Sequence, residues 1–241
     1  RNAVSLVPAP PAGRGEADAA LPGVRADAAG GCAAGGAGAS IRRGGRGLKV
    51  DVDPDRTVAA GGDVRLEQSP EGVAKADAVV LPGVGAFDDC VNAMQRQELF
   101  AAVKDFIETG KPFLGICVGY QALFEKSEEF NSCAVGLGVF VGSVVRFAEN
   151  GLKVPQIGWN QIEIAQPDCP IMKGIDSGSH FYFVHSFFPK PVDESIIATR
   201  TTYGETFASA VWRDNVFATQ FHPEKSQKVG LKLLENFVGL A

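Results

Sequence analysis

The stretch KPFLGICVGYQALF, residues 111–124, decides the fold of this chain. Residues 112–116 are apolar and predict a short strand, and residues 120–124 resume with a helix-like pattern after a sharp turn. A strand that turns directly into a helix is the context of a nucleophile elbow, and the flanking glycines permit the strained turn. Cys117 would then lie at a helix N-terminus, whose partial positive charge favours the reactive thiolate. The alternative is a buried cysteine that acts as a small hydrophobe.

Composition narrows the class of protein. The chain has 241 residues, 45% hydrophobic residues and a formal net charge of −5, which fits one domain with a sizeable core and disfavours general nucleic-acid binding. No apolar run is long enough to span a membrane. The cysteines are scattered without a CxxC or Cys/His cluster, so we expect neither a zinc site nor a disulfide framework. We also expect no other metal and no cofactor. A reducing, cytoplasmic setting is expected. The cysteines are Cys32, Cys90, Cys117, Cys133 and Cys169.

Residues 1–62 differ from the rest of the chain. They hold 13 of the 29 glycines and no aromatic residue, so little apolar side-chain volume is available to offset the entropy lost on ordering. Only residues 3–7 and 48–52 have strand-like patterns. We therefore expect 1–62 to be a low-complexity, poorly ordered or aberrant segment and 63–241 to be the folded domain.

Residues 63–241 have the pattern of an α/β protein. A helix is expected at 69–76 with Ser69 as its N-cap, followed by a strand at 78–81 and one amphipathic helix over 91–108. Alternation of strands and helices implies a mostly parallel twisted sheet flanked by helices, with the ligand site at the carboxyl ends of its strands. The second half is richer in β pattern and ends in a helix at 226–238. The expected strands there are 144–147, 161–164, 181–187, 196–201, 206–211 and 216–221.

A thiol nucleophile needs a base, and His222 is the candidate among three histidines. It follows an apolar strand, so it is expected at the sheet edge to which the elbow also points. Glu224 lies two residues further on and could hold the imidazole in one tautomer, which is the logic of a Cys-His-Glu triad. The alternative for His222 is a strand-end histidine that is bonded to backbone.

Other segments could complete the site. Residues 82–87, PGVGAF, could form an oxyanion hole from the backbone N–H groups of Val84 or Gly85 with that of Val118, or could be an ordinary strand-to-helix turn. The residues His185 and Ser186 could bind substrate or form a buried hydrogen-bonded pair. Residues 153–160 are interpreted as an aromatic-polar loop, in which Trp159 and Asn160 belong to the core or anchor a partner subunit.

Together these motifs resemble those of the class I glutamine amidotransferases. PGVGAF at 82–87, GICVGYQ at 115–121, KVPQIGWN at 153–160, FVHSF at 183–187 and QFHPEKS at 220–226 carry the resemblance, which covers about residues 64–241. More narrowly, they are similar to the glutaminase subunits of imidazole glycerol phosphate synthase, in histidine biosynthesis. The resemblance implies a flavodoxin-like three-layer fold.

The resemblance also implies a reaction and a partner. Cys117 would attack the glutamine side-chain amide, with His222 as acid and base and Glu224 orienting it. The residues around the glutamine would be Gly83, Gln121, His185 and Ser186. Ammonia would pass to a cyclase subunit, a (β/α)8 barrel in a heterodimer, which forms imidazole glycerol phosphate and AICAR. Trp159 and Asn160 would lie at that interface.

One departure from the family leaves alternatives open. The family begins with an apolar strand ending in Asp-Tyr-Gly-x-Gly-Asn, which is not recognisable here. We therefore hypothesise that 1–62 replaces this part and leaves a central slot of the sheet unfilled. The chain would then be an inactive or poorly folded remnant. A third reading is a partner-independent cysteine hydrolase acting on γ-glutamyl peptides.

Overall fold

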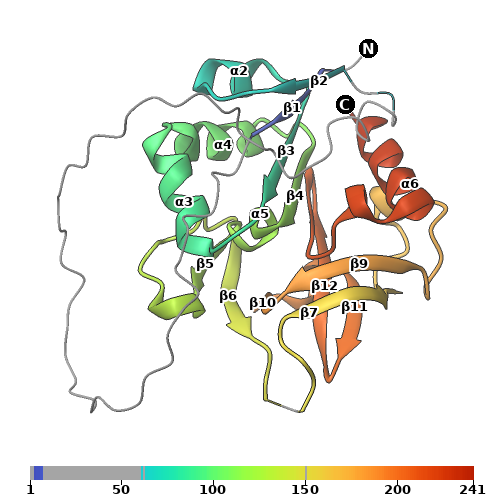
Figure 1. Cartoon of the computed structure of the whole chain (residues 1–241). Coiled ribbons are helices and arrows are strands. Elements are labelled where there is room, and N and C mark those ends of the chain that lie inside the picture. The colour runs from blue at the N-terminus through green and yellow to red at the C-terminus, as the bar shows by residue number, and fades with distance from the viewer. Residues whose placement is uncertain (1–2, 8–60, 62, 150) are drawn as a thin grey trace, which may run out of the picture.

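The computed structural model describes residues 3–7, 61, 63–149 and 151–241. Strands and helices alternate along the chain, with the helices on both sides of a central sheet (Figure 1). The helices are α2 (Pro70–Lys75), α3 (Phe87–Arg96), α4 (Leu99–Glu108), α5 (Val118–Gln121) and α6 (Gln227–Val238). The strands are β1 (Ala3–Leu6), β2 (Asp63–Leu66), β3 (Ala78–Gly83), β4 (Phe113–Cys117), β5 (Phe124–Ser127), β6 (Phe140–Arg146), β7 (Gln156–Gln161), β8 (Glu163–Ile164), β9 (His180–His185), β10 (Phe187–Pro191), β11 (Ile197–Tyr203), β12 (Glu205–Arg213) and β13 (Val216–Thr219).

The central sheet has eight strands in the order β2-β1-β3-β4-β13-β12-β11-β8. The strands from β2 to β13 pair in parallel, and β12, β11 and β8 continue the sheet in antiparallel pairs. A three-stranded sheet, β10-β6-β5, and a two-stranded sheet, β7-β9, complete the second half of the chain. The predicted fold class, a mostly parallel sheet with an antiparallel portion in the C-terminal half, is confirmed.

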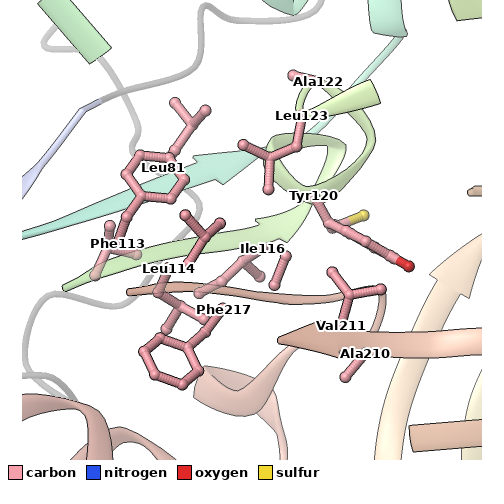
Figure 2. Packing of buried hydrophobic residues seen from close by; sticks show 14 of the residues in the cluster. Leu81, Phe113, Leu114, Ile116, Tyr120, Ala122, Leu123, Ala210, Val211 and Phe217 are labelled. Atoms are coloured by element: carbon pink, nitrogen blue, oxygen red, sulfur yellow. The ribbon is translucent and has the colours of Figure 1, made fainter. Parts of the chain in front are cut away.

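The core lies around the two middle strands of the parallel part, β3 and β4. Every residue of both strands is buried, as expected for parallel strands that are covered on both faces. Figure 2 shows Leu81, Phe113 and Phe217 from three neighbouring strands packed around Leu114 and Ile116. This packing fixes β4, and so fixes where Cys117 at its carboxyl end is placed.

The hypothesis of an unfilled slot in the sheet is wrong. β1 lies between β2 and β3 and pairs in parallel with both. Its Val4 is fully buried, as is Val7 beyond its end. The pattern of residues 3–7 is strand-like, but only the tertiary pairing shows that so short a segment takes a central position. The second expected strand, 48–52, and most of the segment 1–62 lie outside the described residues.

The predicted helix at 91–108 is two helices. α3 ends at Arg96 and α4 begins at Leu99, and Glu98 between them has a left-handed φ of 59°. The spacing of the apolar residues indicates this break, because Met94 and Leu99 are five positions apart and cannot lie on one apolar stripe of a continuous helix. The helix at 69–76 is confirmed, with the Gly72 amide donating to the Ser69 hydroxyl at 3.2 Å.

The interpretation of 153–160 as a loop is wrong over most of its length. Residues Gln156–Gln161 form β7, which pairs antiparallel with β9. Ile157 and Trp159 alternate with polar residues and glycine along this strand, but the face that they share is exposed. Such alternation is typical of a strand, so the interpretation as a loop overlooked a signal that the sequence carries. Among the described residues, no helix combines the length and apolarity needed to cross a lipid bilayer.

Candidate active site

Cys117 ends β4 and begins α5 in a strained turn. Its φ of 55° and ψ of −109° lie outside the regions that L-residues favour, a geometry that costs about 1–3 kcal/mol and concentrates at functional sites. Gly119 lets the turn pack closely against β3, because a Cβ at this position would lie 1.9 Å from the Leu81 carbonyl oxygen. The elbow predicted from the sequence is therefore present, and Cys117 is only 5% exposed.

His222 is held in place by its own backbone. Its amide donates to the Tyr182 carbonyl at 2.9 Å, and its carbonyl accepts from the Ser226 hydroxyl at 2.6 Å. The imidazole Nδ1 lies 2.7 Å from Glu224 Oε1, with both side chains buried. The ring's other nitrogen, Nε2, has no partner within the described residues apart from its interaction with Cys117. One nitrogen is thus occupied by the carboxylate, and the other is available to the thiol.

The electrostatics of His222 favour its protonated form. Burial by itself lowers the pKa of the imidazole. The negative charge of Cys117 and its hydrogen bond oppose this effect, together with the hydrogen bond and charge of Glu224. The net result is a pKa raised to about 10. The pair therefore suits a thiolate beside an imidazolium, which is the reactive state of a cysteine nucleophile.

The sulfur and the imidazole open onto one cavity of about 260 Å³. The cavity lies at the carboxyl ends of β3 and β4, as expected for a ligand site in a parallel sheet. It brings together most of the residues that the sequence predicted, from segments more than a hundred positions apart. Its lining is Val84, Gly85, Cys117, Val118, Gln121, Glu129, Pro155, Val184, His185, Ser186, Phe187 and His222.

The residues predicted for the oxyanion hole all face this cavity. Val84 and Gly85 follow β3, and Val118 directly follows the thiol. Gly85 has a φ of 100°, which a residue with a side chain rarely adopts. Gly83 lies next to Cys117 in the sheet register but is not among the lining residues. A Cβ there would lie 2.7 Å from that of Val118, so its contribution is close packing beneath the elbow.

One backbone carbonyl, that of Phe187, organises two of the predicted binding residues. It accepts from Gln121 Nε2 at 3.1 Å and from His185 Nδ1 at 2.9 Å. Because a carbonyl only accepts, the proton of a neutral His185 resides on Nδ1 and its Nε2 is an unpartnered acceptor among the described residues. Burial lowers the pKa of His185 to about 3, against the effect of the bond to Phe187. His185 is therefore neutral at physiological pH.

Glu129 is a cavity residue that the sequence reasoning missed. It follows β5, and its Oε2 accepts from the backbone N–H of Phe87 at 2.8 Å, at the end of the 82–87 loop. Burial raises the pKa of this carboxyl, with the Phe87 bond acting in the opposite direction. Two consecutive glutamates at 128–129 are typical of a solvated surface, so the sequence does not indicate that Glu129 lines a cavity. The other lining residues that were not anticipated are Pro155, Val184 and Phe187.

The two residues predicted for a partner interface lie away from the cavity. Trp159 is 46% exposed on β7 and packs edge-to-face against Tyr182 at 6.0 Å between ring centroids. Asn160 donates to the Thr202 carbonyl at 3.0 Å. The strand that carries both is paired with β9, whose Tyr182 bridges to His222. Trp159 and Asn160 are not among the residues that line the cavity, although Pro155 directly before β7 is.

The cysteines differ in their bonding state. Cys90, Cys117 and Cys169 are free and buried. Cys133 is disulfide-bonded, and one such bond is not the disulfide framework that the sequence was expected to lack. Within the described ranges, no group of three or more His, Cys, Asp or Glu side chains is arranged to hold a metal ion.

Comparison with known proteins places this geometry in context. Residues 41–240 match the family model described as glutamine amidotransferase class-I. The imidazole glycerol phosphate synthase subunit HisH of Syntrophotalea carbinolica is 52% identical over 183 residues, covering 73% of this chain and 88% of that protein. The subunit of the same name from Acaryochloris marina is 46% identical over 181 residues, covering 74% and 84%.

A solved structure shares the fold at low sequence identity. The crystal structure of a Thermoplasma acidophilum protein described as part of a GMP synthase has a TM-score of 0.62 and 18% identity. The match covers 99% of this chain and 93% of that chain. At such identity the likeness concerns the fold alone.

Proposed function

Because the chain belongs to the class I glutamine amidotransferase family, we propose that it hydrolyses glutamine to glutamate and ammonia as the glutaminase subunit of imidazole glycerol phosphate synthase, in histidine biosynthesis. One observation carries the proposal. A strained cysteine and a His222–Glu224 pair meet at a single cavity at the carboxyl edge of the sheet. The names of the relatives that are about 50% identical supply the pathway.

The chemistry follows from the charges of the pair. The Cys117 sulfur attacks the side-chain amide carbon of glutamine, and the carbonyl electrons move onto the oxygen. The C–N bond then breaks, and the leaving nitrogen takes the proton of the His222 imidazolium, which gives ammonia and a γ-glutamyl thioester. His222 next takes a proton from water, whose oxygen attacks the thioester. Glutamate leaves, and the thiolate with its imidazolium is restored.

The transient oxyanion needs hydrogen-bond donors. The backbone N–H of Val118 lies at the start of α5, and those of Val84 or Gly85 lie across the cavity. One such donor typically contributes about 3–4 kcal/mol to the transition state. The positive φ of Gly85 indicates a loop whose peptide orientation depends on glycine, so this loop is the part of the site through which a partner could switch activity.

The polar groups of the cavity suit the other end of glutamine. Gln121 directs both hydrogens of its amide away, to Phe187 O and to Gln220 Oε1, so its own oxygen remains to accept from a ligand. Glu129 adds a carboxylate to the lining of the same cavity. Two acceptors, one of them charged, provide a site for the α-ammonium group. Ser186 and the neutral His185 line the cavity as well.

Ammonia must reach a second active site. We place the partner, a cyclase subunit with a (β/α)8 barrel that forms imidazole glycerol phosphate and AICAR, against the exposed face of β7. Ile157 and Trp159 are 58% and 46% exposed there, which suits an interface anchor. Asn160 lies at the same edge. Cytoplasmic residence follows from the pathway.

The test is glutamate release by the full chain, alone and with the cyclase subunit, with Cys117→Ala as the control. We expect release that rises with the cyclase and is lost in the variant. No release by the assembled complex would favour an inactive remnant. Release from γ-glutamyl peptides without any partner would favour a stand-alone cysteine hydrolase.

A further inference from the structure

Gln220 lies next to the nucleophile without lining the cavity. It follows β13, two residues before His222, and is fully buried. Its backbone amide donates to the Ser209 carbonyl at 2.8 Å, which holds the backbone of this residue in place. The side-chain oxygen accepts from Gln121 Nε2 at 3.2 Å, and the side-chain nitrogen lies 3.7 Å from Cys117 Sγ. The second distance suits a hydrogen bond to the larger sulfur atom.

The orientation of the two amides follows from their partners. The Phe187 carbonyl can only accept, so the group of Gln121 that faces it must be its NH2. That same NH2 faces Gln220, which must therefore present its oxygen there. Rotating the Gln220 amide by half a turn would set NH2 against NH2. The NH2 group of Gln220 consequently faces the sulfur. This assignment of oxygen and nitrogen rests on the hydrogen-bond network rather than on observed hydrogens.

We propose that Gln220 is a positioning residue that donates a hydrogen bond to the Cys117 thiolate and ties that sulfur to the substrate-binding Gln121. A donor aimed at the charged form of a group favours that form, and the effect is strengthened where water is excluded. Gln220 thus stabilises the thiolate without lining the cavity in which glutamine would bind. The hydrogen bonds that run from Phe187 O through both amides also fix the position of the Gln121 side chain relative to the Cys117 sulfur. The catalytic part of this role rests on the proposed function.

The test follows alkylation of Cys117 by iodoacetamide against pH in the full chain, by mass spectrometry of the Cys117 peptide. Burial raises the pKa of Cys90 and of Cys169 to about 12, so these thiols compete little. In Gln220→Met, which has a similar shape and no donor, we expect the pH midpoint of alkylation to rise by about one unit. Glutamine turnover should fall at neutral pH and recover as the pH rises.

Thr219→Val is the matched control. Thr219 is the adjacent residue, is fully buried, and its hydroxyl donates to the Phe221 carbonyl at 2.9 Å. The variant therefore loses one buried hydrogen bond in the same segment without touching the sulfur. Its alkylation midpoint should match that of the unmodified chain. A folded Gln220→Met with the same midpoint as Thr219→Val would overturn the proposal.

A second measurement needs no change at Gln220. The side-chain amide resonance of Gln220 should move with the ionisation of Cys117 in an NMR pH titration and should lose that step in Cys117→Ala. An amide shift that is independent of pH would also overturn the proposal. Neither alkylation nor NMR requires glutamine turnover, so failure of the proposed function and failure of this inference are distinguishable.

Discussion

His222 Nδ1 lies 2.7 Å from Glu224 Oε1, and the two side chains are 2% and 1% exposed. Two residues of one short segment therefore form a buried pair, and the bond from the His222 amide to the Tyr182 carbonyl ties this segment to β9. The second carboxylate oxygen of Glu224 has no partner among the described residues. Its charge is therefore directed mainly to the imidazole, which is poised between this carboxylate and the thiol.

Replacing Glu224 by glutamine should lower the pKa of His222 and slow turnover. Glu224→Gln removes the charge and introduces an amide NH2 that can face Nδ1, so the stabilisation of the imidazolium and the control of the tautomer are both lost. We expect the pKa of His222, now about 10, to fall, and kcat to decrease roughly 10²–10⁴-fold. NMR titration of the imidazole and glutamate release measure the two effects. Glu235→Gln, at an exposed position of α6, should change neither, and an unchanged kcat in Glu224→Gln would contradict this role.

The carboxylate of Glu129 should act on binding rather than on chemistry. In Glu129→Gln the bond from the Phe87 amide can persist, while the charge that would attract an α-ammonium group is lost. We expect KM for glutamine to rise about 10-fold or more, with a smaller change in kcat. Glu128→Gln changes the exposed neighbour in the same way and should leave both constants as they are. A fall in kcat with constant KM would show that Glu129 instead serves the 82–87 loop.

Acid should destabilise the fold through His185. Its pKa is about 3 in the folded protein and near 6.5 when unfolded, so the unfolded state binds more protons between these values. The free energy of unfolding is therefore fully maintained above about pH 6.5 and decreases as the pH falls toward 3. Urea unfolding at several pH values measures the slope. In His185→Phe the dependence of the free energy of unfolding on pH should become shallower. The comparison is His180→Phe, the same change at an exposed position.

The short first strand should contribute measurably to stability. Val4 is fully buried in β1 between two parallel neighbours, so Val4→Ala should lower the free energy of unfolding by about 2 kcal/mol. Val192→Ala makes the same chemical change at a position that is 72% exposed and should cost less than about 0.5 kcal/mol. Equal stability of the two variants in denaturant unfolding would mean that β1 does not hold its central position in solution.

Local motifs carried most of the predictable information. The elbow at Cys117 was recognisable because a strand, two glycines and a helix pattern occur within a short stretch. The Ser69 cap and the closing helix were recognisable for the same reason. Glu224 could be assigned as a partner of His222 because both lie in one short segment. In each case the physical signal acts over a few residues and is written directly in the sequence.

Long-range pairing could not be read in this way. The central position of β1 depends on hydrogen bonds to strands that begin far later in the chain, at Asp63 and Ala78. β7 exposes its apolar side chains, and only its pairing with β9 shows that it belongs to a separate two-stranded sheet. Glu129 reaches the cavity only because the segment after β5 and the 82–87 loop are packed together.

The sequence by itself determined the family and predicted the nucleophile and its base, because these depend on residue types at short, fixed spacings. Only the tertiary structure decided which polar groups face one another across the cavity. The orientation of Gln220 toward the sulfur, for example, follows from a chain of donors and acceptors on β4–α5, β10 and the segment after β13. Hydrogen bonds have direction, and direction is settled only when distant segments are brought into contact.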